Sequence, residues 1–148
     1  MLIDKNIEDL APDIVCSSVK ATETRQEALR ILIVDDDEQV IETLSKALEI
    51  IDVSTEIKTS LTGEGALKLL EFNSFDLVIL DVNLPDIDGG DVLRFVRTQA
   101  KNATAKIIAI SGVPNVLDSM LQLGADVSLS KPFKLCELTD NIKKLVNT

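Results

Sequence analysis

The sequence contains no histidine, tryptophan or tyrosine, and four phenylalanines are its only aromatic residues. Because histidine is absent, imidazole cannot serve as a general base, a metal ligand or a phosphoryl carrier in this chain. The chain also lacks the aromatic side chains that usually stack on nucleic-acid bases or on a flavin ring. These absences leave carboxylate, hydroxyl and amine groups as the candidates for chemistry.

Cysteines and long apolar runs are scarce as well. Cys16 and Cys136 are the only cysteines among 148 residues, too few and too far apart for a disulfide framework or a zinc cluster. No segment approaches the ~18 apolar residues of a membrane span, and the N-terminus has no basic region followed by an unbroken apolar stretch. The sequence therefore predicts a cytoplasmic protein without a membrane partner.

Basic residues are outnumbered by acidic ones. The 15 Lys and Arg residues against 25 Asp and Glu residues give a formal net charge of −10. Affinity for phosphate backbones comes mainly from Lys and Arg, so this charge argues against direct binding of nucleic acid or of an anionic membrane. An anion bound here is expected to need a metal bridge.

A change in composition near Arg30 divides the chain. Residues 1–29 show no sustained period and are predicted to form a flexible N-terminal arm. Residues 30–148 show clear periodicity, contain no repeat and have an ordinary length for one domain.

Short apolar runs alternate with helical patterns in residues 30–148. Three runs, 31–34, 77–80 and 107–110, are apolar at every position, as in parallel strands covered on both faces. Two segments, 53–57 and 126–130, instead alternate apolar and polar residues, which is typical of strands with one solvated side. We expect these two strands at the edges of the sheet.

Each predicted strand is followed by a stripe of apolar residues at helical spacing. The stripes are Val40, Ile41, Leu44, Ala47 and Leu48; Ala66, Leu67 and Leu70; Val92, Leu93 and Val96; Val116, Leu117, Met120 and Leu121; and Leu135, Leu138, Ile142 and Leu145. Right-handed crossovers and the two edge assignments make 2-1-3-4-5 the simplest strand order. The predicted fold is an α/β fold with a doubly wound, five-stranded parallel sheet of the flavodoxin type, (βα)5.

Polar residues stand where the predicted strands end. Asp35 and Asp36 follow the first strand, Asp81 the third, Ser111 the fourth and Lys131 the fifth. In an open parallel sheet the ligand crevice lies beyond the carboxyl ends of the strands, where the winding reverses. We therefore expect these five side chains to converge between the first and third strands.

Three carboxylates in one crevice repel one another. Two unit charges about 4 Å apart repel by about 1 kcal/mol in water and by roughly 4 kcal/mol at an effective dielectric constant of about 20. A hard divalent cation such as Mg2+, together with Lys131, would offset that repulsion. A carboxylate beside Mg2+ and a lysine, with a hydroxyl across the gap, is suited to accept a phosphoryl group.

Four segments resemble the receiver domain of two-component response regulators, the CheY-like family. They are 31–37, 81–89, 110–112 and 131–133, with the sequences ILIVDDD, DVNLPDIDG, ISG and KPF. The resemblance covers essentially residues 30–148. Four motifs in this order and spacing make it specific, whereas one alone would be weak.

The resemblance implies a Mg2+ site. Asp36 would ligate the ion directly, Asp35 would assist through water, Asp81 would contribute its carboxylate, and Asn83 would contribute its backbone carbonyl.

The resemblance also implies a phosphoryl-transfer reaction. Asp81 would take the phosphoryl group from a phosphohistidine of a sensor histidine kinase or a histidine phosphotransfer protein. Ser111 would hydrogen-bond a phosphoryl oxygen, and Lys131 would pair with the phosphoryl group. The domain would then be a signalling switch that catalyses its own phosphorylation, rather than a metabolic enzyme.

The same resemblance implies where the output lies. A downstream protein partner would bind the face formed by the helix around 116–121, the strand 126–130 and the helix around 135–145. Many receivers carry a Tyr or Phe on the last strand that moves inward after phosphorylation, and the matching residue here is Ser128. This departure leaves open a pseudo-receiver, an interaction module that works without phosphorylation.

Two other functions fit the residues less well. A phosphatase of the haloacid dehalogenase type needs its nucleophile on the first strand and a second Asp two positions later. In this chain Asp81 follows the third predicted strand, and the residue two positions later is Asn83. In a flavodoxin-like flavin binder the acidic loop after the first strand would repel the flavin phosphate.

Some of the polar and sulfur-containing residues have a purely structural interpretation. One of the three consecutive aspartates at 35–37 is expected to cap the helix that begins near Glu38. Asp86 and Asp88 are expected to cap or solvate a loop, and Met120 and Cys136 to pack on apolar helix faces.

Overall fold

The structure is a computed structural model that describes residues 28–51 and 54–146. Residues 1–27 of the predicted N-terminal arm lie outside the described residues, as does residue 53 at the start of the predicted second strand. The arm therefore stays a prediction. No helix in the described part of the chain has the length and apolar character needed to cross a membrane.

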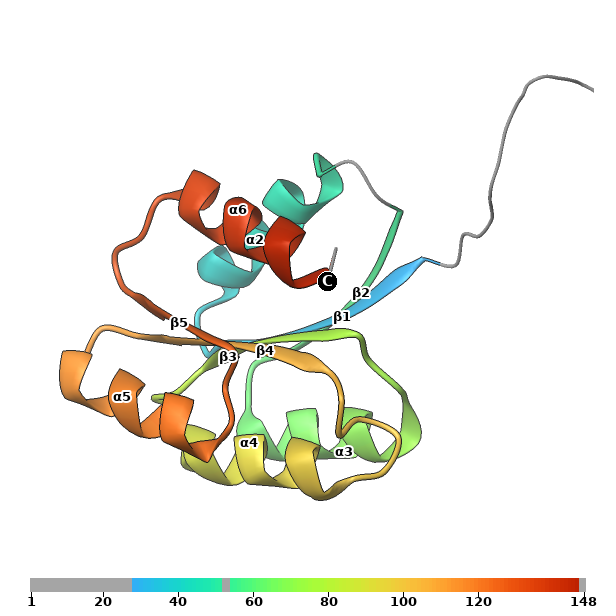
Figure 1. The fold of residues 1–148 in the computed structure, drawn as a ribbon, viewed down its shortest axis with the longest axis vertical. Coiled ribbons are helices and arrows are strands. Elements are labelled where there is room, and N and C mark those ends of the chain that lie inside the picture. Colours follow the sequence, from blue (N-terminus) through green and yellow to red (C-terminus); the bar gives the residue numbers. More distant parts are fainter. Residues whose placement is uncertain (1–27, 52–53, 147–148) are drawn as a thin grey trace, which may run out of the picture.

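Five parallel strands form one sheet in the order β2-β1-β3-β4-β5 (Figure 1). The strands are β1 (Leu29–Val34), β2 (Thr55–Ser60), β3 (Leu77–Asp81), β4 (Lys106–Ser111) and β5 (Val127–Ser130). The helices α2 (Glu38–Glu49) and α6 (Leu135–Val146) cover one face of the sheet, and α3 (Gly63–Phe72), α4 (Gly89–Thr98) and α5 (Pro114–Leu123) cover the other. This confirms the predicted α/β fold and its 2-1-3-4-5 strand order.

The sheet separates two apolar clusters. Leu32 and Val34 of β1 point into the cluster under α3, α4 and α5, whereas Ile31 and Ile33 point into the cluster under α2 and α6. Successive residues of a strand face opposite sides, so a central strand that is covered on both faces must be apolar at every position. Each fully buried Leu or Ile contributes about 1.5–3 kcal/mol to folding.

The strands β2 and β5, whose sequences mix polar and apolar residues, lie at the two edges of the sheet, as the sequence pattern predicted. The end of β2 was nevertheless predicted too early, because the strand continues from Ile57 to Ser60. Its last residues pair in register with the end of β1, where Ser60 lies opposite Val34. Pairing with β1 extends β2 through polar residues, and the alternation of apolar and polar side chains does not predict this extension.

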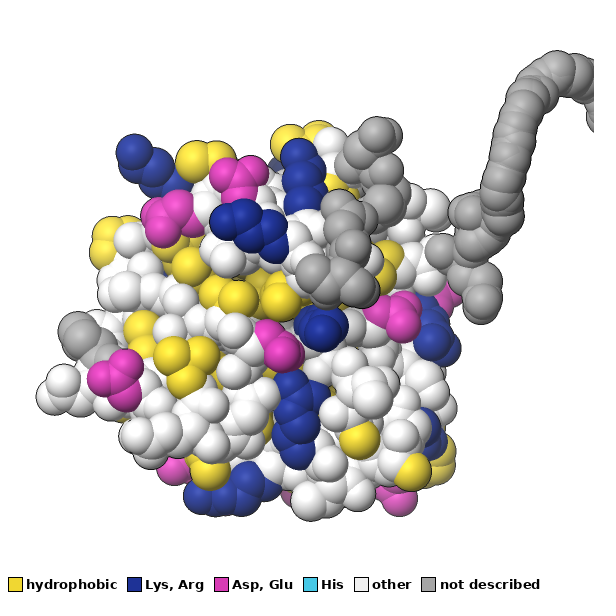
Figure 2. All heavy atoms as spheres, viewed as in Figure 1, with side chains coloured by type: hydrophobic (Ala, Val, Ile, Leu, Met, Phe, Trp, Pro, Cys, Tyr) yellow, Lys and Arg dark blue, Asp and Glu magenta, His cyan; other side chains and the backbone are white. Residues whose placement is uncertain are grey.

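The helix surfaces carry interspersed charges of both signs, and apolar side chains are visible between α6 and the strands (Figure 2). Met120 is buried in the core, as predicted. Cys136 is exposed, so its interpretation as a packing residue was wrong. On α6 the residues buried against the sheet are Leu138 and Ile142, and a residue two positions before Leu138 faces nearly the opposite way.

Aspartates from the preceding loops cap the starts of α2 and α4. Asp37 caps α2 by accepting from the N–H of Gln39 at 2.9 Å, so it is the capping member of the three consecutive aspartates. Asp88 caps α4 in the same way. These caps satisfy backbone N–H groups that have no partner within the helix.

Asn102 is a fully buried polar residue that joins two loops at the amino ends of the strands. Its Oδ1 accepts a hydrogen bond from the N–H of Phe75 at 2.8 Å. Its Nδ2 donates to the carbonyl oxygens of Leu70 and Asn73 at 3.0 and 3.1 Å. The side chain therefore fixes the α3–β3 loop against the segment that leads from α4 into β4.

We expect Asn102→Ala to lower the free energy of unfolding by about 2–4 kcal/mol, because it leaves buried donors and acceptors without partners. Urea denaturation followed by circular dichroism measures the change. The matched control is Asn73→Ala, which removes one side-chain hydrogen bond to the carbonyl of Leu69 and should cost about 1 kcal/mol or less. Equal losses in the two variants would contradict this role for Asn102.

Candidate functional site

The strand register brings the acidic residues together at the carboxyl edge of the sheet. Val34 of β1 pairs with Leu80 of β3, and the residues that follow them are Asp35 and Asp81. Because the two strands are parallel neighbours, both chains leave the sheet at the same level.

The same register brings in the hydroxyl and the amine. Asp81 pairs with Ile110 of β4, so Ser111 stands one position beyond it. Ser111 in turn pairs with Ser130, the last residue of β5, directly before Lys131. Four adjacent strands thus deliver all the predicted site residues to one edge, as the sequence analysis expected.

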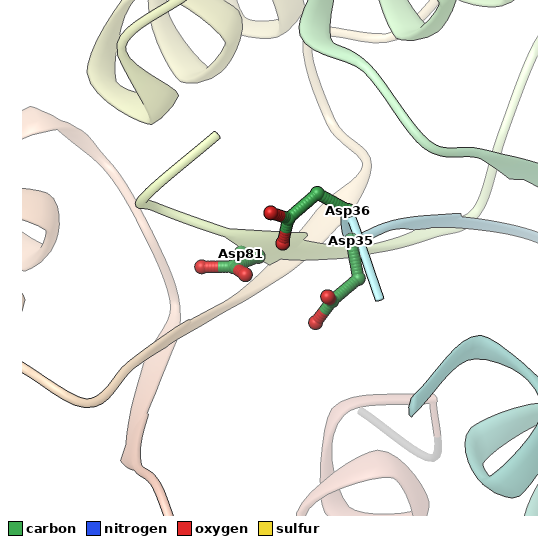
Figure 3. Close-up of side chains that lie close together, drawn as sticks. All are labelled: Asp35, Asp36 and Asp81. Atoms are coloured by element: carbon green, nitrogen blue, oxygen red, sulfur yellow. The ribbon is translucent and has the colours of Figure 1, made fainter. Parts of the chain in front are cut away.

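Three carboxylates meet at the ends of β1 and β3 (Figure 3). One oxygen each from Asp35, Asp36 and Asp81 lies within 4.8 Å of the others. The residues Asp35 and Asp81 are only 1% and 5% exposed, whereas Asp36 is exposed. Two of the three charges are therefore held almost out of water, where their repulsion is least screened.

Lys131 supplies the compensating charge. Its Nζ lies 3.1 Å from Oδ2 of Asp35 and 3.2 Å from Oδ2 of Asp81, so one ammonium donates to both buried carboxylates. Its backbone N–H donates to the carbonyl of Ser111 at 2.9 Å, which holds the start of the β5–α6 loop beside the site.

Burial and charge pairing have opposite effects on the pKa values of Asp35 and Lys131. Burial raises the pKa of the Asp35 carboxyl above its usual value, although the N–H of Asp37 and the Lys131 ammonium both donate to the ionised form. Burial acts to lower the pKa of the Lys131 ammonium, but the hydrogen bonds and charges of Asp35 and Asp81 outweigh it, and the pKa is raised. Lys131 is therefore charged at neutral pH.

The donor set fits Mg2+. With all three carboxylates ionised and Lys131 protonated, three negative charges and one positive charge leave the cluster at −2. This hard cation prefers carboxylate oxygens as ligands, and water completes its coordination shell. Asp35, Asp36 and Asp81 thus form an acidic triad typical of the Mg2+ site of receiver domains.

Ser111 is fully buried, and its hydroxyl already makes two hydrogen bonds within the protein. Its Oγ donates to Oδ1 of Asn83 at 2.6 Å and accepts from the N–H of Val113 at 2.9 Å. The N–H of Asn83 donates to Oδ1 of Asp81 at 2.9 Å. The sequence analysis considered only the backbone carbonyl of Asn83 and missed this contact of its side chain, which no sequence pattern signals.

The loop between β3 and α4 turns back sharply onto its own start. Asn83 and Asp88 form an isolated antiparallel bridge, and the N–H of Gly89 donates to the carbonyl of Val82 at 3.0 Å. A Cβ at Gly89 would lie 2.5 Å from the Cα of Val82, so the turn requires glycine at this position. This explains the glycine of the DVNLPDIDG segment as turn chemistry.

Residues 31–143 match the family model of the response regulator receiver domain. The chain belongs to this family. This receiver is 37% identical over 119 residues to the probable transcriptional regulatory protein SilR of Salmonella typhimurium, a match that covers 80% of the chain and 51% of SilR. The chain spans about half the length of the curated relatives it matches.

Two solved structures illustrate the similarity in fold. A putative response regulator from Chloroflexus aurantiacus is 31% identical, with a TM-score of 0.75, and the match covers 82% of this chain and 100% of that one. The BeF3-activated receiver domain of DrrB, a Thermotoga maritima protein, is 27% identical, with a TM-score of 0.73 and coverage of 82% and 100%. The protein is thus a CheY-like receiver domain of two-component systems, and its acidic pocket is consistent with phosphoacceptor activity.

We expect Asp35→Asn to raise the free energy of unfolding at neutral pH, measured in EDTA, by about 1 kcal/mol, because burial and the nearby Asp81 disfavour the charge of Asp35 more than Lys131 stabilises it. The amide can still accept from the N–H of Asp37, and Lys131 keeps Asp81 as a partner. Adding Mg2+ should stabilise the wild type more than the variant.

Urea denaturation with and without Mg2+ tests both parts of this prediction. The control is Asp118→Asn, which removes an exposed carboxylate of α5 and should leave both quantities unchanged. A variant that is less stable than the wild type in EDTA would disprove the cost assigned to the buried carboxylate.

Proposed function

We propose that this receiver is a Mg2+-dependent phosphoacceptor, and that Asp81 takes the phosphoryl group from a phosphohistidine of a sensor histidine kinase or a histidine phosphotransfer protein. The observation that carries the proposal is the environment of Asp81. Its carboxylate lies at the end of a central strand, nearly buried, with Lys131 on one oxygen and the N–H of Asn83 on the other.

Asp81 is the nucleophile in this proposal. One of its carboxylate oxygens forms a bond to phosphorus as the bond between phosphorus and the donor imidazole nitrogen breaks, and the electron pair of that bond stays on the imidazole. No proton has to leave Asp81, because the carboxylate attacks in its ionised form. The protein's task is to position the reactants and to neutralise charge, which is the main source of catalysis in phosphoryl transfer.

The residues that would hold Mg2+ are Asp35, Asp36, Asp81 and the backbone carbonyl of Asn83. When bound, Mg2+ would neutralise the negative charge that a phosphoryl group brings to an already acidic crevice. Asp36 is the exposed member of the triad, so its carboxylate is accessible to an ion and its waters.

Lys131 and Ser111 would bind the transferred group. Lys131 now donates to Asp81 and Asp35, and it can shift one of these hydrogen bonds to a phosphoryl oxygen while it stays paired with the other carboxylate. Ser111 would have to exchange Asn83 for the phosphoryl oxygen as the acceptor of its hydroxyl hydrogen. This exchange links occupation of the site to the start of α5, because Val113 donates to the same hydroxyl oxygen.

The phosphodonor partner would dock beside Lys131. A cavity of about 570 Å³ lies between the first turns of α2 and the β5–α6 loop, and its lining includes Val40, Leu44, Phe133 and Lys131. Lys131 contacts Asp81 at one end of its side chain and borders this apolar cavity. A partner that fills the cavity could therefore bring its phosphohistidine to Asp81.

The phosphorylated receiver would signal to a downstream protein through the face formed by α5, β5 and α6. A pseudo-receiver, which binds partners without phosphorylation, is the second candidate. It is favoured by Ser128, which stands on β5 where many receivers have an aromatic residue.

Labelling by a small acyl phosphate such as acetyl phosphate tests the proposal. We expect Mg2+-dependent phosphorylation of the wild type, detected by intact-protein mass spectrometry, and its loss in Asp81→Asn. The control Asp118→Asn, on the exposed side of α5, should be labelled like the wild type.

Labelling of Asp81→Asn at the wild-type level would refute Asp81 as the acceptor. A wild type that neither binds Mg2+ nor becomes labelled would favour the pseudo-receiver.

A second prediction concerns the hydrogen bond that holds Ser111 at rest. We expect Asn83→Ala to raise the affinity for beryllofluoride, a mimic of the phosphoryl group, by about fivefold, since Ser111 no longer gives up a hydrogen bond of about 1 kcal/mol. The backbone carbonyl at position 83 is retained. Fluorine NMR titration measures the affinity, with Asn141→Ala on α6 as the control, and an unchanged or weaker affinity for Asn83→Ala would argue against this competition.

A further inference from the structure

Asp86 ties the loop after Asp81 to a different helix. Its Oδ1 accepts from the N–H of Gly63 and its Oδ2 from the N–H of Glu64, both at 2.9 Å. Gly63 and Glu64 are the first two residues of α3, where backbone N–H groups have no partner within the helix and the helix dipole favours a negative charge. Donation by Glu64 and then by Gly63 lowers the pKa of the Asp86 carboxyl, so it is ionised at neutral pH.

Both α3 and α4 already have another capping side chain, so the hydrogen bonds of Asp86 are not required to cap either helix. Thr62 already caps α3 by accepting from the N–H of Gly65 at 3.0 Å, and Asp88 caps α4 by accepting from the N–H of Gly90 at 2.8 Å. Asp86 belongs to neither helix, and it accepts from residues 22 and 23 positions earlier in the chain. Its carboxylate is therefore a tertiary link between the β3–α4 loop and α3.

The loop fits closely against the start of α3. A Cβ placed at Gly63 would lie 3.0 Å from the Cβ of Ile87, so the absence of a side chain at Gly63 lets the loop approach. Ile87 also packs against the apolar cluster under α3, α4 and α5. The two neighbours Asp86 and Ile87 thus hold the loop to the same end of α3, one by hydrogen bonds and the other by packing.

Short-range contacts close the loop on itself. Anchoring the loop at Asp86 therefore also restricts the position of Asn83. The bridge between Asn83 and Asp88 and the hydrogen bond from Gly89 to Val82 fold residues 82–89 into one compact turn. Asn83 lies in this turn with its N–H on Asp81 and its side chain on Ser111.

We propose that Asp86 is a positioning residue of the phosphoacceptor site, which holds the backbone carbonyl of Asn83 in place by anchoring the β3–α4 loop to the N-terminus of α3. This inference rests on the proposed function, since it assumes that Asn83 contributes to a Mg2+ site. It also makes the start of α3 responsive to the site, because any shift of the loop on Mg2+ or phosphoryl binding changes the hydrogen bonds to Gly63 and Glu64.

The test compares Asp86→Ala with Thr62→Ala in the full chain. Both variants remove side-chain acceptors at the start of α3, but only Asp86→Ala releases the β3–α4 loop. Partners that orient metal ligands typically account for 10–100-fold in affinity, so we expect Mg2+ to bind Asp86→Ala about tenfold more weakly. Thr62→Ala should keep the wild-type affinity, even where urea denaturation shows that it is less stable.

A second measurement separates positioning from general loss of stability. In the wild type, the amide NMR signals of Gly63 and Glu64 should shift when Mg2+ and beryllofluoride are added, and in Asp86→Ala this response should be lost. Asp86→Asn keeps the size of the side chain and one carbonyl acceptor, so it should fold and show an intermediate affinity. It provides the comparison should Asp86→Ala fail to fold.

Equal Mg2+ affinities for the wild type and the Asp86 variants, or equal losses in Asp86→Ala and Thr62→Ala, would overturn the positioning role while Asp81 labelling stays intact. Absence of Mg2+ binding and of labelling in the wild type would overturn the proposed function and this inference together.

Discussion

Two nearly buried carboxylates share a single ammonium at the carboxyl edge of the sheet, and the rest of the site depends on this arrangement. Asp35 and Asp81 come from adjacent parallel strands, so their closeness follows from the pairing of β1 with β3 rather than from any mutual attraction. Lys131 compensates one negative charge, and Asp36 adds another at the rim. The folded chain therefore maintains a local excess of negative charge, which suits a divalent cation and a phosphoryl group bound together.

Hydrogen bonds within the protein hold the side chains around this excess charge. Lys131 is shared by two carboxylates, Ser111 is held by Asn83, and the loop that carries Asn83 is anchored to α3 through Asp86. In the proposed reaction a phosphoryl group would offer new acceptors to Lys131 and Ser111, so it would compete with the present acceptors for the same donors. Such competition is the physical basis on which a small chemical change can shift a fold between two states.

Particular residues show how far sequence patterns reach and where they stop. The uniformly apolar runs at 31–34, 77–80 and 107–110 became the central strands, because burial on both faces leaves no place for a polar side chain. The pattern failed at the end of β2, where pairing with β1 carries the strand through polar residues, and at Cys136, whose helix turns other residues to the sheet. In both cases a neighbouring element, absent from the local pattern, decided the outcome.

By itself the sequence determined the number and order of the elements, which strands are central, and which polar residues stand at the strand ends. Periodicity and burial are properties of short segments, so they can be inferred segment by segment. Only the tertiary structure decided that Ser111 donates to Asn83 and that Asp86 accepts from the first residues of α3. Those contacts depend on the path of a loop and the direction of a few side chains, which are set only after distant elements have packed together.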